Sequence, residues 1–62
     1  MFIPANKLTT DHSIYEIQIE GEILTMETPA RILNTWQHGP CTTVLTRRGY
    51  VEYPAHADVK VA

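Results

Sequence analysis

The sequence predicts a small α+β domain, a two-layer sandwich in which one α-helix packs on a mainly antiparallel sheet of three to five strands. Ile, Val and Thr occupy 18 of the 62 positions, and branching at Cβ favours strands. Stretches of alternating apolar and polar residues support the sheet. Strong start and stop signals at about residues 28–38 predict the single helix.

Size and cysteine content limit how this domain is stabilised. At 62 residues the chain has room for one domain spanning residues 1–62, and a chain this short buries a modest fraction of its surface. The single cysteine, Cys41, excludes an internal disulfide. We therefore expect either a small, well-formed core or a homodimer that buries a second face.

The first predicted strand starts near Ile14, after an arm or loop at 1–12 that has no sustained periodicity. In the strand, apolar side chains alternate with polar ones, so one face is expected to pack on the core and the other to be acidic. The expected core face is Tyr15, Ile17 and Ile19, and the polar face is Glu16, Gln18 and Glu20. Gly21 then marks either a tight hairpin turn, which we favour, or a bulge within one long strand.

The helix prediction rests on residues at both of its ends. Thr28 can cap a helix and Pro29 suits the first helical position. Gly39 and Pro40 fit a left-handed C-cap followed by a residue that stops the helix. Between them Ile32, Leu33 and Trp36 follow at helical spacing, which makes Trp36 the expected anchor of the helix in the core.

The second half of the sheet is predicted as a hairpin of residues 41–46 and 50–53, with Arg48 and Gly49 as its two loop residues. Its inward face would consist of Val44, Thr46, Val51 and Tyr53. Pro54 ends the ladder because it has no N–H to donate. A short last strand is expected at 58–61, where apolar and charged residues alternate.

Charge and hydropathy bear on location and partners. The net charge of −2 argues against a general nucleic-acid binder. It divides unevenly, because residues 1–30 carry five acids and one base whereas residues 31–62 carry four bases and two acids. No apolar stretch is long enough for a transmembrane helix and the start does not resemble a signal peptide. We expect a complete cytoplasmic gene product.

Two surfaces stand out as candidate binding sites. Glu16, Glu20 and Glu22 form a predicted acidic stripe that could dock on a basic partner, although charges on an exposed strand also simply prevent aggregation. Arg47, Arg48 and Tyr50 form a hairpin tip suited to phosphate contact and base stacking, or to a protein interface. An ordinary exposed turn is the simpler interpretation of the tip.

The sequence predicts no enzyme, metal site or cofactor site. His38 and Cys41 lie three apart but lack a second pair of ligands, so a capping histidine and a buried thiol are expected. Cys41, His56 and Asp58 can be written as a triad, but a short chain permits such a set by chance. The three glycines are isolated at turns and form no phosphate-binding loop.

By elimination, the sequence favours a non-catalytic protein-binding module that inhibits or modulates a larger complex. In size and expected one-helix architecture the chain resembles small phage- or plasmid-borne regulators that bind a host protein, an analogy of architecture alone. A dimeric DNA- or RNA-binding regulator that uses the Arg47–Arg48 tip is one alternative. A structural or assembly subunit is another.

Overall fold

A computed structural model describes residues 1–62 and shows an almost entirely β protein. The α+β prediction is wrong, because the only helical element is one turn of 3-10 helix. In chain order the elements are β1 (Phe2–Pro4), η1 (Ala5–Lys7), β2 (Ser13–Ile19), β3 (Glu22–His38), β4 (Cys41–Thr46), β5 (Gly49–Pro54) and β6 (Asp58–Lys60). No helix is long and apolar enough to cross a membrane.

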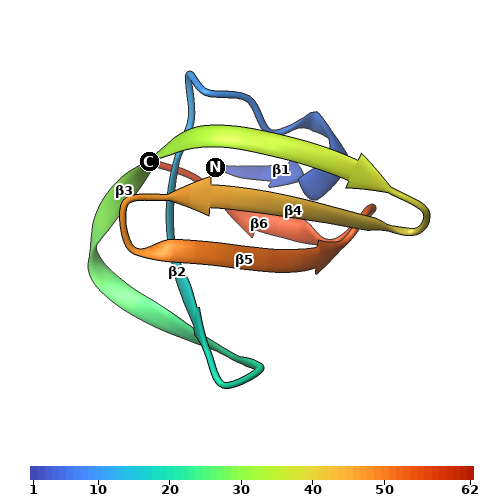
Figure 1. The fold of residues 1–62 in the computed structure, drawn as a ribbon. Coiled ribbons are helices and arrows are strands. Elements are labelled where there is room, and N and C mark those ends of the chain that lie inside the picture. The colour runs from blue at the N-terminus through green and yellow to red at the C-terminus, as the bar shows by residue number, and fades with distance from the viewer.

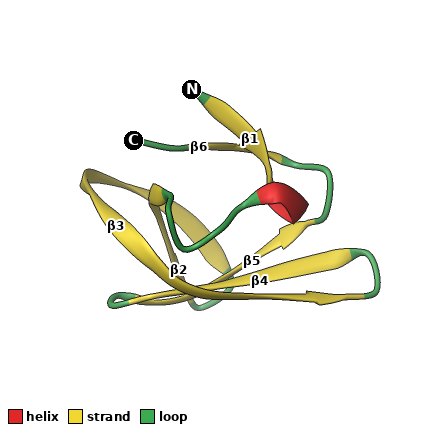
Figure 2. Ribbon diagram, turned by 90° about the horizontal axis from the view of Figure 1, so that it is seen from above, coloured by secondary structure: helices red, strands yellow, loops and turns green.

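The strands form two antiparallel sheets that face one another. β2, β3, β4 and β5 form a curled four-stranded sheet in that order, and β1 pairs with β6 in a second, two-stranded sheet. The small sheet lies behind β3, β4 and β5 in Figure 1. Figure 2 shows the two sheets from above, with η1 between them. The protein therefore has two layers, both made of strands.

The core fills the space between the two sheets. It comprises nine buried residues from every part of the chain: Ala5, Leu8, Ile14, Ile32, Val44, Val51, Tyr53, Val59 and Val61. Ala5 and Leu8 come from the segment 1–12, which was expected to be an arm or loop and is instead part of the packed body. Because the core is so small, each member contributes a large share of its packing.

The predicted helix at 28–38 does not exist, and β3 runs through it. The signals that suggested a helix have other roles in the strand. Gly39 and Pro40 are the two loop residues of the β3–β4 hairpin, since His38 pairs with Cys41. Gly39 has a φ of 60°, as a two-residue hairpin turn that starts with glycine requires. With the helix gone, the analogy with one-helix phage and plasmid regulators loses its basis.

Pro29 is tolerated because β3 is locally unpaired there. Ile14 pairs with Ala30 and Glu16 with Thr25, so Tyr15 alone lies opposite residues 26–29. A proline in a regular central ladder would remove a hydrogen bond, but within an irregularity it costs little. The break also bends β3, so that its first half pairs with β2 and its second half with β4.

The two other hairpins are also closed by short turns with residues in the left-handed region. Ile19 pairs with Glu22, so Glu20 and Gly21 form the β2–β3 turn, with φ values of 51° and 83°. This confirms the predicted hairpin and excludes the single long strand. At the β4–β5 turn, Arg47 and Arg48 are followed by Gly49 at φ 119°.

The β4–β5 hairpin has the predicted inward face but not the predicted register. Thr46 pairs with Gly49 and Val44 with Val51, so the loop residues are Arg47 and Arg48. Each partner differs from the prediction by two positions, which leaves every side chain on the same face of the sheet. Val44, Thr46, Val51 and Tyr53 are accordingly all buried.

Gly39→Ala is expected to destabilise the protein by about 1–2 kcal/mol, because a Cβ disfavours a left-handed φ. No atom lies within 4 Å of where that Cβ would be, so the loss comes from the backbone alone. Urea denaturation followed by circular dichroism measures it. Gly39→Asn is the matched control and should lose less, since asparagine adopts this conformation more readily. Equal losses would contradict the backbone explanation.

Candidate functional site

The outward face of β3, β4 and β5 carries the candidate site. Three cross-strand rows follow from the register: Asn34–Leu45–Tyr50, Trp36–Thr43–Glu52 and His38–Cys41–Pro54. These nine positions alternate with side chains that point into the core, such as Val44 and Val51. We call them the outer face.

Two aromatic rings dominate the outer face. Trp36 is 41% exposed and Tyr50 is 59% exposed, and their ring centroids lie 6.0 Å apart with the planes tilted by 38°. They lean together from β3 and β5 across β4, and with His38 and Thr43 they line a shallow, open hollow of about 350 Å³. Tyr50 was correctly expected to point outward, whereas the prediction that Trp36 anchors the core is wrong.

Trp36 points outward because of a bulge three residues before it. Ile32 pairs with Thr46 but Asn34 pairs with Leu45, so Leu33 is an extra residue in β3. Such a bulge reverses which alternate residues face the core. Ile32 is therefore buried, while Asn34, Trp36 and His38 lie on the outer face.

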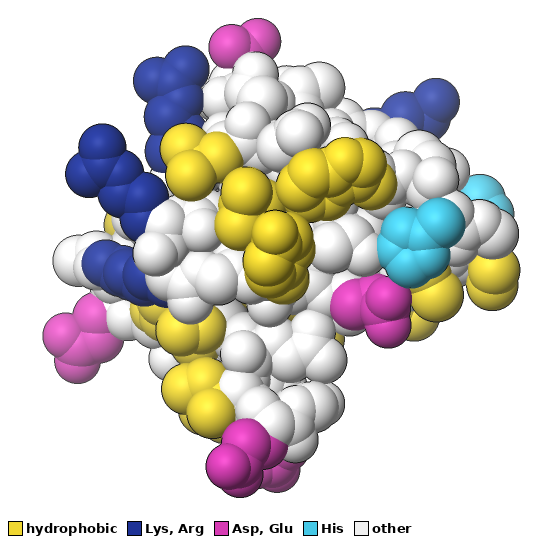
Figure 3. Space-filling model, in the orientation of Figure 1, with side chains coloured by type: hydrophobic (Ala, Val, Ile, Leu, Met, Phe, Trp, Pro, Cys, Tyr) yellow, Lys and Arg dark blue, Asp and Glu magenta, His cyan; other side chains and the backbone are white.

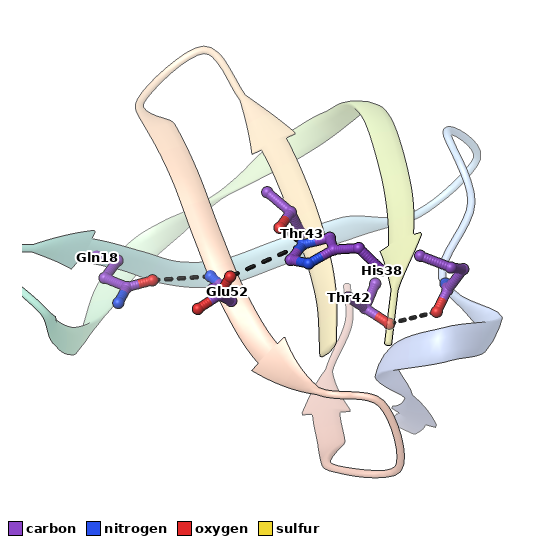
Figure 4. A network of polar contacts seen from close by, with 6 residues as sticks. Gln18, His38, Thr42, Thr43 and Glu52 are labelled. Atoms are coloured by element: carbon purple, nitrogen blue, oxygen red, sulfur yellow. Dashed lines mark hydrogen bonds and ion pairs between the residues drawn. The ribbon is translucent and has the colours of Figure 1, made fainter. Parts of the chain in front are cut away.

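Polar groups from β3, β4 and β5 border the aromatic pair on the side of the β3–β4 turn. The Nε2 atom of His38 is within hydrogen-bond distance of the Thr43 hydroxyl and 3.7 Å from the Oε2 atom of Glu52. The backbone N–H of Glu52 donates a hydrogen bond of 2.7 Å to the side-chain oxygen of Gln18 in β2. Figure 4 shows these contacts meeting at Glu52. They position one carboxylate beside the hollow.

The space-filling view shows how these groups are distributed. Hydrophobic side chains gather in the middle of the face formed by β3, β4 and β5, and an acidic and a histidine side chain lie at one border (Figure 3). Most of the Lys and Arg side chains in view lie on the opposite side (Figure 3). The middle of the face is thus apolar, and the lysine and arginine side chains lie mostly away from the border that carries the acidic and histidine side chains (Figure 3).

The three glutamates of the predicted acidic stripe do not share one face. Glu16 turns toward β5, where its Oε1 atom accepts a 2.8 Å hydrogen bond from the hydroxyl of Tyr53. Glu20 and Glu22 lie at the exposed β2–β3 turn. The face of β2 expected to pack on the core is also reversed, since Ile14 is buried whereas Ile19 is half exposed.

The Tyr53 hydroxyl makes the free energy of unfolding depend on pH in the alkaline range. Burial, reinforced by the hydrogen bond and negative charge of Glu16, raises the pKa of Tyr53 above its ordinary value. A tyrosine whose folded-state pKa is raised stabilises the fold fully below the unfolded value. That contribution is lost as the pH rises beyond it.

We expect the wild-type free energy of unfolding to fall more steeply above pH 10 than that of Tyr53→Phe, by up to about 1.4 kcal/mol per pH unit. Urea titrations between pH 8 and 11 measure both slopes. Tyr50→Phe removes an exposed hydroxyl instead and should follow the wild type. Parallel curves for wild type and Tyr53→Phe would contradict the assignment.

The predicted hairpin tip is divided between two roles. The guanidinium of Arg48 donates to the Thr28 carbonyl oxygen at 3.0 Å and to the Thr28 hydroxyl at 3.1 Å. It therefore ties the β4–β5 turn to the bend in β3. Arg47 is exposed at the turn, and Tyr50 belongs to the aromatic pair. The three residues do not act as one basic tip.

The sequence interpretation missed four members of the site: Trp36, His38, Thr43 and Glu52. In the sequence Trp36 is flanked on both sides by polar residues, Asn34, Thr35, Gln37 and His38, so polarity gives no signal of which residues share its face. The helical spacing of Ile32, Leu33 and Trp36 is the stronger local pattern. His38 and Cys41 face each other across a turn rather than at a helix end, and Cys41 is half-buried.

The site is a shallow surface built from strands. No group of three or more His, Cys, Asp and Glu side chains is placed to hold a metal ion. Comparison with known proteins adds nothing to this geometry: no family model, curated protein or solved structure matches the chain.

Proposed function

We propose that the protein is a non-catalytic protein-binding module and that the outer face is its docking surface. The observation that carries the proposal is the aromatic pair, in which Trp36 and Tyr50 are both substantially exposed and lie 6.0 Å apart. Tryptophan and tyrosine are the residues most enriched among those that dominate binding energy at protein interfaces.

The scaffold under the pair supports this proposal. β3, β4 and β5 are joined by short turns, and their inward side chains Val44 and Val51 are fully buried. Rings held on paired strands lose little further freedom on binding, which favours affinity. Large apolar groups gathered in one exposed patch commonly mark interaction sites.

Site-specific photo-crosslinking tests the proposal. A photoreactive amino acid at Asn34, on the outer face, is expected to crosslink a defined protein in cells that express the chain. The same amino acid at Lys60, on β6 away from that face, should not. Trp36→Ala combined with the Asn34 crosslinker should abolish the product. Equal crosslinking from Asn34 and Lys60 would refute the assignment of this surface. So would equal crosslinking from Asn34 with and without the Trp36→Ala substitution.

The nucleic-acid alternative is favoured by one observation, since exposed aromatic rings such as Trp36 and Tyr50 can stack on unpaired bases. Binding of this kind also needs several cations along the strand. Arg48 is occupied by Thr28, which leaves Arg47 as the free arginine of the turn. The homodimer and the assembly subunit stay predictions, and sedimentation distinguishes a 7.0 kDa monomer from both.

A further inference from the structure

The outer face has an unusual charge composition. Its nine positions include one carboxylate, Glu52, and neither lysine nor arginine. The chain's five basic side chains lie elsewhere in the sequence, at Lys7, Arg31, Arg47, Arg48 and Lys60. The Glu52 side chain is 55% exposed, and its one close ion-pairing partner is His38 at 3.7 Å. Its charge thus remains available to a partner.

The faces of the two aromatic rings carry negative electrostatic potential, which has the same sign as the charge of Glu52. The face of an indole or phenol ring attracts a cation placed within about 6 Å of its centroid. Trp36 and Tyr50 both line the hollow, with their planes tilted by 38°, so a cation that enters it comes close to both rings. Thr43 lies between Trp36 and Glu52 in the cross-strand row. The Thr43 side chain and the His38 ring in contact with it line the hollow over β4.

We propose that the hollow receives a lysine or arginine side chain from an extended basic segment of the protein partner. The cation would lie against the rings of Trp36 and Tyr50, with its charge beside the carboxylate of Glu52. This inference rests on the proposed function, because it identifies the chemistry of the partner that docks on the outer face. The aliphatic part of the same side chain would cover apolar surface.

The same arrangement disfavours a nucleic-acid strand on this face. A phosphate group that approached the rings would meet the Glu52 carboxylate at the border toward His38. None of the nine positions supplies the lysine or arginine that holds a phosphate. Charge complementarity therefore selects a basic protein segment among the partners that can use exposed aromatic rings.

A peptide titration followed by nuclear magnetic resonance tests the inference on the whole chain. The probe is acetyl-Gly-Arg-Gly-Arg-Gly-amide, with the matched peptide in which glutamine replaces both arginines as its neutral control. We expect the arginine peptide to shift the indole N–H signal of Trp36 saturably, with a dissociation constant in the millimolar range. The glutamine peptide should shift it little.

Two variants separate the carboxylate from the overall charge. Glu52→Gln is expected to weaken binding of the arginine peptide by up to about fivefold, the scale of one exposed ion pair. Glu22→Gln changes the net charge equally but lies at the exposed β2–β3 turn, so it should leave the affinity unchanged. Trp36→Leu removes the only indole signal of the chain, so its titration is followed through the backbone amide signals of Thr43 and Tyr50, which should show no saturable shift. The dispersion of the amide spectrum checks that this variant is folded.

Three outcomes would overturn the inference: equal shifts with both peptides, equal losses in the two glutamate variants, or stronger shifts with an oligothymidine strand. The first two leave the proposed function intact if crosslinking at Asn34 still captures one protein. If that crosslinking fails while the arginine peptide binds through Glu52, the docking proposal fails and a cation-binding surface remains. The two proposals can therefore fail separately.

Discussion

Ile32→Ala is expected to destabilise the protein by about 2–4 kcal/mol, enough to unfold a large fraction of the molecules at 37 °C. Ile32 is fully buried in a core of nine residues, and removing its outer carbons leaves a cavity that the two sheets cannot close. A domain of this length has a total stability of roughly 3–9 kcal/mol. Urea and thermal denaturation monitored by circular dichroism measure the loss.

Leu33→Ala is the matched control for that variant. Leu33 is the next residue along β3, forms the bulge, and is 49% exposed. Its truncation removes a side chain of equal size from a site with much less packing, so the loss should be below about 1 kcal/mol. Similar losses at both positions would mean that the register of β3 beyond the bulge differs from the one described.

Trp36→Ala is expected to weaken binding of the partner captured by crosslinking by at least about 30-fold, equivalent to roughly 2 kcal/mol. The indole supplies the larger ring of the aromatic pair and a wall of the hollow. Its loss also removes the ring against which Tyr50 leans. Isothermal titration calorimetry with the purified partner measures the change.

The control for this variant must show that the fold survives. Trp36 lies outside the core cluster, so its replacement should lower the melting temperature far less than Ile32→Ala does. Leu24→Ala truncates another exposed apolar side chain, on the β2–β3 hairpin, and should leave partner affinity unchanged. Unchanged affinity in Trp36→Ala would exclude the outer face as the docking surface.

Local patterns predicted the parts of this fold that local interactions determine. Gly21 marked a hairpin turn and Arg47–Gly49 marked another, because left-handed φ values there call for glycine or a short turn. The alternation of apolar and polar residues correctly predicted which side chains of β4 and β5 face the core. The predicted register was wrong by two residues, and a shift of two residues leaves each side chain on the same face of the sheet. These elements need no knowledge of distant residues.

The helix prediction failed where local and tertiary preferences oppose each other. Thr28, Pro29, Gly39 and Pro40 fit the two ends of a helix, but each of them also fits a bend or turn in a β-sheet. A bulge at Leu33 removed the strict alternation that would have revealed the strand. Pairing of the two parts of β3 with β2 and with β4 outweighs the intrinsic preference of so short a segment.

The candidate site was misjudged for the same reason. In a helix the size of Trp36 would make it the core anchor, whereas in the strand the bulge turns it outward. The sequence alone gives no sign of the place of Glu52 in the site, because that place depends on Thr43 and Trp36 in neighbouring strands. Relations across strands of this kind are visible only when the register is known.

The pairing of β1 with β6 has a consequence for how the chain folds. Phe2 lies opposite Lys60, so this contact must close a loop of almost the entire chain. The three hairpins of the larger sheet close loops of two residues each and can form within microseconds. Loop-closure entropy therefore places the small sheet late in folding. Ala5 and Leu8 follow β1 in the chain and belong to the core, so they would complete the packing in the same late step.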